Sequence, residues 1–143
     1  GTKENGIFEK IEEYLNKDGI VIGCSAGAVL FSKDIDIIAK MDKNEVELKD
    51  TNGFDCLNGI SVFPHYTNTK SSLTDEENEI RTLEFTKAIT TFSTEIGDVI
   101  AIPEEDTIYV HDDMYEIETK FNSISHQIGY KEYNKMEYQA VNK

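Results

Sequence analysis

The feature that constrains the fold most is a short apolar run that leads into a cluster of small residues. Ile20, Val21 and Ile22 are all β-branched, and the segment Gly23-Cys24-Ser25-Ala26-Gly27 follows them directly. An uninterrupted β-branched run is typical of a central parallel strand that is covered on both faces. Helical periodicity precedes the run and also follows the small residues. The order helix, strand, tight turn, helix predicts an α/β fold with a mostly parallel sheet flanked by helices.

Periodicity elsewhere extends this pattern over most of the chain. Helices are predicted for residues 5–17, 26–32 and 76–95, the first with Asn5 as its N-cap, and strands for 20–22, 60–63 and 99–102. Weaker strand signals lie at 35–39 and 46–48, 107–110 and 114–119 are predicted to form a hairpin, and 67–75 is a polar loop. The residues from Phe121 onward show no period and are not assigned. A chain of 143 residues is expected to form one domain, 1–143.

Composition excludes several classes of function. The formal charge of −14, without a Lys and Arg cluster, disfavours nucleic acid and anionic membranes as partners. Cys24 and Cys56 are too few for a disulfide framework and lack the paired spacing of a zinc site. No apolar run reaches bilayer length and no signal-peptide pattern is present. We therefore expect a cytoplasmic protein without a metal or another cofactor.

The segment Gly23-Cys24-Ser25-Ala26-Gly27 fits the pattern G-x-S-x-G between a predicted strand and a predicted helix, which is the context of a nucleophile elbow. Ser25 is the candidate nucleophile in this context. The N–H group of Ala26 is the candidate donor to the oxyanion that forms on attack. The structural alternative is that small residues here only allow a helix to pack closely on a strand.

A serine nucleophile needs a histidine base, and the chain has three histidines. His65 follows the predicted strand 60–63, at the edge of a parallel sheet where active sites gather. His111 lies in the predicted hairpin turn and His126 in the unassigned tail, so both are expected to be solvated surface residues. Position alone favours His65 as the base.

Three sequence blocks resemble the signatures of the dipeptidase E family, peptidase family S51, in the same order and at compatible spacings. They are Ile22-Gly23-Cys24-Ser25-Ala26-Gly27-Ala28, Asn52-Gly53-Phe54-Asp55-Cys56-Leu57 and Phe63-Pro64-His65-Tyr66-Thr67-Asn68. The resemblance implies a flavodoxin-like, class I glutamine amidotransferase-like fold in which Ser25 and His65 are catalytic. Further along, Ile102-Pro103-Glu104-Glu105 resembles the family's late Pro-Glu turn, which precedes a hairpin.

The third catalytic residue implied by the resemblance is an Asp between the serine and the histidine. Asp42, in Met41-Asp42-Lys43-Asn44, best matches that position and is expected to orient His65. Asp34, Asp36 and Glu45 are acidic alternatives in the same segment. Cys24 resembles the cysteine nucleophile of related amidotransferases, but it precedes the elbow position that Ser25 occupies.

The resemblance also implies that this chain lacks the family's N-terminal strands, whose Gly-rich end has only Gly1-Thr2 as its counterpart here. The leading hypothesis is a serine peptidase that cleaves short peptides, including dipeptides with N-terminal Asp. The alternative is a catalytically silent α/β module, or one part of a split domain. In that case a second copy or a partner chain is expected to cover an exposed sheet edge.

Overall fold

Two short parallel strands form the centre of the molecule, β1 (Ser61–Phe63) and β2 (Val99–Ala101), with Ser61 opposite Val99. The computed structural model describes residues 5–39, 41–45, 47–112, 114–118, 127–128 and 137–141. All six residues of β1 and β2 are buried, as expected for strands covered on both faces. β5 (Gln127–Ile128) pairs with β2 in the antiparallel direction, which gives a sheet of order β1-β2-β5.

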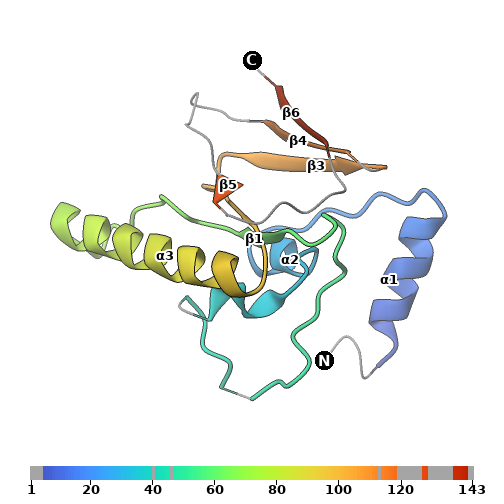
Figure 1. The fold of residues 1–143 in the computed structure, drawn as a ribbon, viewed down its shortest axis with the longest axis horizontal. Coiled ribbons are helices and arrows are strands. Elements are labelled where there is room, and N and C mark those ends of the chain that lie inside the picture. Colours follow the sequence, from blue (N-terminus) through green and yellow to red (C-terminus); the bar gives the residue numbers. More distant parts are fainter. Residues whose placement is uncertain are drawn as a thin grey trace.

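Helices cover one face of this sheet. They are α3 (Asp75–Glu95), the short α2 (Ala26–Val29) and the 3₁₀ helix η1 (Ile35–Ile38). Figure 1 shows α3 running along one side of β1. The side chains buried between the helices and the sheet form one apolar cluster: Val29, Ile37, Phe63, Phe85, Ile89, Val99 and Ala101.

A second sheet covers the opposite face of β1 and β2 (Figure 1). It contains β3 (Thr107–His111), β4 (Met114–Glu118) and β6 (Glu137–Val141), in the order β3-β4-β6. β3 and β4 form the predicted antiparallel hairpin, and β6 pairs with β4 in the parallel direction. The apolar cluster on this face consists of Leu57, Ile60, Val62, Ile100, Ile102, Tyr115 and Ile117. The α/β class is therefore confirmed, although each small sheet combines one parallel with one antiparallel pairing.

The long helix α3 begins where its sequence predicts. Thr74 is the N-cap, and its hydroxyl accepts from the N–H of Glu77 while the Glu77 carboxylate accepts from the N–H of Thr74. This reciprocal pair is a capping box, and it occupies N–H groups that the first turn leaves without helical partners. Further along, the hydroxyls of Thr82 and Thr86 each bond the carbonyl four residues earlier. A helix rich in threonine can therefore enter the core without leaving these hydroxyls unpaired.

The predicted central strand 20–22 is wrong. Residues 19–24 follow an extended path without strand pairing, and Ile20 and Ile22 are 83% and 84% exposed. No backbone hydrogen bond to residues 20–23 is present among the residues that the structure describes. The β-branched run favours a strand, but a strand also requires a neighbour, and the described chain does not provide one.

Other predicted elements differ in length or type. α1 (Ile7–Asn16) is confirmed, but its N-cap is Gly6, and Asn5 accepts from the N–H of Ile7. The helix predicted for 26–32 ends after four residues, since α2 covers only Ala26–Val29. Residues 35–39 contain η1 rather than a strand, and the described part of 46–48 is irregular. Most of the tail from Phe121 onward, with His126, lies outside the described residues.

Candidate active site

Ser25 lies at a sharp turn between the extended segment 19–24 and α2. Its backbone has φ 53° and ψ −120°, a conformation that side-chain-bearing residues rarely adopt. A Cβ on Gly23 would lie 2.5 Å from the Gly27 carbonyl oxygen, so position 23 admits only glycine without rearrangement. A Cβ on Gly27 would meet nothing within 4 Å, so close approach accounts for only the first of the two glycines. The turn therefore has the geometry of a nucleophile elbow, with the tight approach at Gly23.

The chain after Gly53 fixes the C-terminal side of the elbow helix. A Cβ on Gly53 would lie 2.2 Å from the Ser32 carbonyl oxygen, so the two backbones approach too closely for any other residue. Four consecutive N–H groups donate to carbonyls at and after the end of α2. The pairs are Gly53 to Lys33, Phe54 to Leu30, Asp55 to Ser32 and Cys56 to Phe31, at 2.7 to 3.0 Å. These bonds anchor the helix that follows Ser25.

His65 follows β1 directly after the buried Pro64, as its position in the sequence predicts. Its Nε2 atom lies 2.8 Å from Ser25 Oγ, a hydrogen-bond distance between residues 40 positions apart. The loop that carries it is tied to two elements: the Tyr66 N–H donates to the Ile102 carbonyl at 3.1 Å, and the Tyr66 hydroxyl bonds Thr86 of α3 at 2.6 Å. The structure thus brings the two residues that the sequence singled out into direct contact.

The other ring nitrogen of His65 contacts a carboxylate that the sequence analysis did not assign. His65 Nδ1 lies 2.9 Å from Glu104 Oε1. Glu104 follows β2, and the carboxyl ends of the parallel strands β1 and β2 meet at one edge of the sheet. A neutral imidazole has one N–H group. The carboxylate of Glu104 can only accept a hydrogen bond, so this N–H lies at Nδ1, and Nε2 can accept the Ser25 proton. This tautomer is the one that a general base needs.

The position expected for Asp42 is therefore taken by Glu104. Asp42 is exposed on the loop after η1, and its N–H donates to the Ile38 carbonyl. Among the acidic alternatives, Asp34 accepts from the N–H of Asp36 as the cap of η1. The physical reason is topological, since this loop does not follow a strand that is parallel to β1. The Pro103-Glu104 turn is visible in the sequence as a resemblance to the family. Its closeness to His65 depends on the pairing of β1 with β2, which the sequence does not show.

A family comparison agrees with this geometry. Residues 1–118 match the model of peptidase family S51, which covers the elbow, His65 and Glu104. The chain belongs to peptidase family S51. The match confirms the family resemblance seen in the sequence. It also supports the expectation that the protein is a peptidase, which is a class of hydrolase. No curated protein and no solved structure matches the chain.

The N–H of Ala26 in this S51 peptidase has no hydrogen-bond partner among the described residues. It directly follows the exposed Ser25 and remains available to a substrate oxygen. Cys24 is also exposed, whereas Cys56 is partly buried. Burial raises the pKa of the Cys56 thiol above its usual value, and the charges of Asp55 and Glu12 raise it further.

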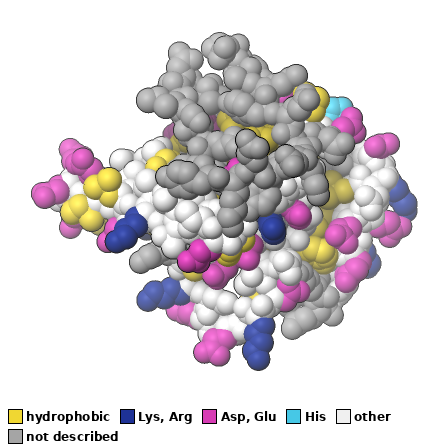
Figure 2. Space-filling view, in the orientation of Figure 1, with side chains coloured by type: hydrophobic (Ala, Val, Ile, Leu, Met, Phe, Trp, Pro, Cys, Tyr) yellow, Lys and Arg dark blue, Asp and Glu magenta, His cyan; other side chains and the backbone are white. Residues whose placement is uncertain are grey.

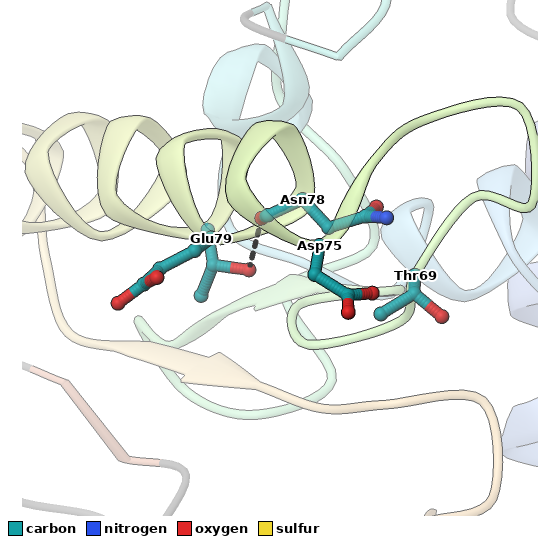
Figure 3. Close-up of a pocket in the computed structure, with 5 residues that line it drawn as sticks. Thr69, Asp75, Asn78 and Glu79 are labelled. Carbon is teal, nitrogen blue, oxygen red and sulfur yellow. Dashed lines mark hydrogen bonds between the residues drawn. The ribbon is translucent and has the colours of Figure 1, made fainter.

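A shallow, open concavity lies at the start of α3. Thr69 and Asp75 face each other across it in Figure 3, with Asn78 and Glu79 nearby. The Asn78 side chain is fully used by the loop, because it accepts from the Lys70 N–H and donates to the carbonyls of Lys70, Leu73 and Thr74. We assign this concavity a structural role at the junction of loop and helix.

Two further observations concern the described residues. They contain no group of three or more His, Cys, Asp or Glu side chains placed to hold a metal ion. In the same residues, no helix is long and apolar enough to cross a membrane. His111 is exposed at the end of β3, 3.7 Å from Asp112, and among the described residues no hydrogen bond or ion pair joins it to Ser25, His65 or Glu104.

Proposed function

We propose that this S51 chain is a serine-type peptidase in which Ser25 is the nucleophile, His65 the general base and Glu104 the residue that orients the imidazole. One observation carries the proposal: a single imidazole bridges a hydroxyl at 2.8 Å and a carboxylate at 2.9 Å. A general base must lie within about 2.6 to 3.2 Å, between heavy atoms, of the group whose proton it removes, and the Ser25–His65 distance meets this condition. Glu104 takes the role that the sequence alone suggested for Asp42.

The proposed reaction proceeds by acyl transfer. Ser25 Oγ attacks the carbonyl carbon of the scissile bond while its proton passes to His65 Nε2. The oxyanion of the tetrahedral intermediate accepts the free Ala26 N–H, which the elbow places next to the attacking oxygen. The C–N bond then breaks, His65 returns the proton to the leaving amine, and an ester forms on Ser25. Water, activated by the same imidazole, hydrolyses this ester and restores the enzyme.

Short peptides are the proposed substrates. The Ser25 side chain is exposed, and 26% of the His65 side chain is accessible, so the dyad faces solvent rather than a closed chamber. The resemblance to dipeptidase E favours dipeptides with N-terminal Asp. Hydrolysis of an aspartyl dipeptide, followed by release of free aspartate, is therefore the first reaction to measure.

The test combines hydrolysis with covalent labelling. A fluorophosphonate probe should label wild-type protein at one residue, Ser25, as shown by peptide mass spectrometry. Ser25→Ala should lose both labelling and hydrolysis, while the neighbouring Cys24→Ser should keep both because His65 Nε2 bonds the Ser25 hydroxyl. Hydrolysis that survives Ser25→Ala would refute the proposed nucleophile.

A second candidate function rests on the exposed segment 19–24. Ile20 and Ile22 present two apolar side chains to solvent, and their backbone has no partner among the described residues. Such an edge can accept another strand. We propose, as the alternative, that the chain is one part of a larger flavodoxin-like sheet whose remaining strands come from a second polypeptide or a second copy.

Charge favours a different polypeptide over a second copy. The chain has a formal charge of −14, and Figure 2 shows acidic side chains scattered over the visible face with few basic ones between them. Two copies would repel each other, apart from any local complementarity. Sedimentation velocity tests the second-copy version: a strictly monomeric wild type argues against it, and self-association that Ile22→Thr abolishes supports it. Labelling of the isolated chain at Ser25 argues against a required second polypeptide.

A further inference from the structure

Asn68 links the two loops that carry His65 and Glu104. Its side-chain Oδ1 accepts from the backbone N–H of Glu104 at 2.8 Å. Its own N–H donates to the His65 carbonyl at 3.3 Å. Asn68 therefore bonds the loop that carries His65 through its backbone, and the turn that carries Glu104 through its side chain. Asn68 lies 36 positions before Glu104, so this link depends on the fold and not on local sequence.

Glu104 needs such a link because little else restrains it. Its side chain is 61% exposed, and its turn lies between the buried Pro103 and the exposed Glu105. An exposed glutamate loses rotamer freedom when it is held in one place, which opposes the contact with His65. When the backbone N–H of Glu104 is held in place, its carboxylate can reach fewer positions away from His65 Nδ1.

Asn68 is in turn held by the core through α3. Arg81 Nη1 donates to the Asn68 carbonyl at 2.8 Å, and the Arg81 guanidinium lies 4.6 Å from the centre of the Phe85 ring. Phe85 is buried in the cluster beneath β1 and β2. A planar guanidinium stacked on an aromatic ring has few orientations available, so it holds its acceptor in place. The connection thus runs from the core through Arg81 and Asn68 to the Glu104 turn.

We propose that Asn68 is a positioning residue that holds the Glu104 carboxylate against His65 Nδ1. The inference rests on the proposed function for its effect on catalysis, whereas the positional effect itself stands on geometry alone. The Asn68 side-chain oxygen is the feature that matters, because it is the atom that accepts the Glu104 N–H.

The kinetic test compares three variants. Asn68→Ala removes the acceptor and should lower kcat about 10- to 100-fold, as small displacements of catalytic groups do, while KM changes less than about twofold. Asn68→Asp keeps an acceptor oxygen in the same place and should recover most of the loss. The matched control is Asn78→Ala, which removes four side-chain hydrogen bonds from the same loop and none to Glu104. It should lower Tm and leave kcat unchanged in folded protein.

A double-mutant cycle separates positioning from general damage to the fold. If Asn68 acts through Glu104, adding Asn68→Ala to Glu104→Ala should cost no further activity. A second full loss in the Glu104→Ala background would mean that Asn68 acts elsewhere, and it would overturn the proposal.

A measurement without turnover keeps this inference distinct from the proposed function. In nuclear magnetic resonance spectra, the His65 Nδ1–H proton should give a protected downfield resonance in wild type, Asn68→Asp and Asn78→Ala, and lose it in Asn68→Ala. Loss of this resonance in Asn68→Ala would support the positioning role. If the same wild-type protein is not labelled by fluorophosphonate, the peptidase mechanism would be refuted while the positioning role stands. A resonance that is unchanged in Asn68→Ala, or missing from wild type, would overturn the positioning role whatever the activity.

Discussion

Replacing Glu104 by Gln tests the identity of the third catalytic residue directly. The change keeps the size and shape of the side chain and removes the charge that lies 2.9 Å from His65 Nδ1. That charge stabilises the imidazolium that forms when Ser25 gives up its proton. Opposite charges about 4 Å apart attract by about 1 kcal/mol in water and about 4 kcal/mol near a protein surface, which sets the range of the effect.

The exposure of the pair places the expected loss within this range. The His65 side chain is 26% exposed and the Glu104 side chain 61%, so solvent screens part of the attraction. Because about 1.4 kcal/mol corresponds to a tenfold change in rate, Glu104→Gln should lower kcat about 10- to 1,000-fold. The amide also favours the wrong imidazole tautomer, which shifts the expectation toward the upper part of the range.

The assay measures kcat for an aspartyl dipeptide and the rate of fluorophosphonate labelling, because both depend on activation of Ser25. Asp42→Asn is the matched control, since it removes one carboxylate from an exposed loop that the structure does not join to His65. Activity should be within about twofold of wild type in this control, as for an ordinary surface substitution. Full activity in Glu104→Gln together with a large loss in Asp42→Asn would refute the assignment made from the structure.

Three further predictions follow from local geometry. Gly23→Ala should cost about 1 to 3 kcal/mol of stability through overpacking against Gly27, whereas Gly27→Ala should be neutral or stabilising by about 0.5 to 1 kcal/mol; urea unfolding compares them, and equal losses would contradict the steric reasoning. A raised pKa leaves less thiolate at a given pH, so Cys56 should react with iodoacetamide at pH 8 more slowly than the exposed Cys24, and faster reaction at Cys56 would be inconsistent with its burial. Thr74→Ala should lower the free energy of unfolding by about 1 kcal/mol without changing kcat, and an unchanged unfolding midpoint would mean that the capping box contributes nothing.

The Ser25–His65 pair could be predicted from the sequence because each residue has a local signal. Ser25 lies among small residues between a β-branched run and a helical pattern. His65 directly follows an apolar run that ends at proline. Both signals lie within a few residues of the side chain concerned. The rule that active-site residues gather at strand ends explains only the place of His65, and the 2.8 Å contact with Ser25 depends on how the fold places the elbow beside it.

The third member could not be predicted in the same way. Glu104 lies 39 positions after His65, and it reaches the imidazole only because β1 and β2 are parallel neighbours. The chain has 28 acidic residues, and Asp42 is favoured among them only because it best matches the Asp that the family resemblance implies between the serine and the histidine. Strand pairing is a property of the whole fold, so a local pattern does not contain it.

The failed strand at 20–22 has a related cause. Local composition reports that Ile20, Val21 and Ile22 suit a pleated, buried environment. It does not report whether a neighbouring strand exists, and the exposure of Ile20 and Ile22 shows that the described chain supplies none. The long helix α3, by contrast, is predicted to within one residue at its start because its apolar positions are local signals, although its cap Thr74 lies in the segment predicted as a loop.

The backbone at the elbow has a consequence for how this sequence can change over time. Ser25 is held at φ 53° and His65 at φ 59°, so both residues of the dyad occupy conformations that glycine adopts more easily. Ser25→Gly should relieve about 1 to 3 kcal/mol of strain while removing the attacking oxygen. Stability and the proposed chemistry therefore oppose each other at position 25, since the substitution that relaxes the backbone also removes the hydroxyl.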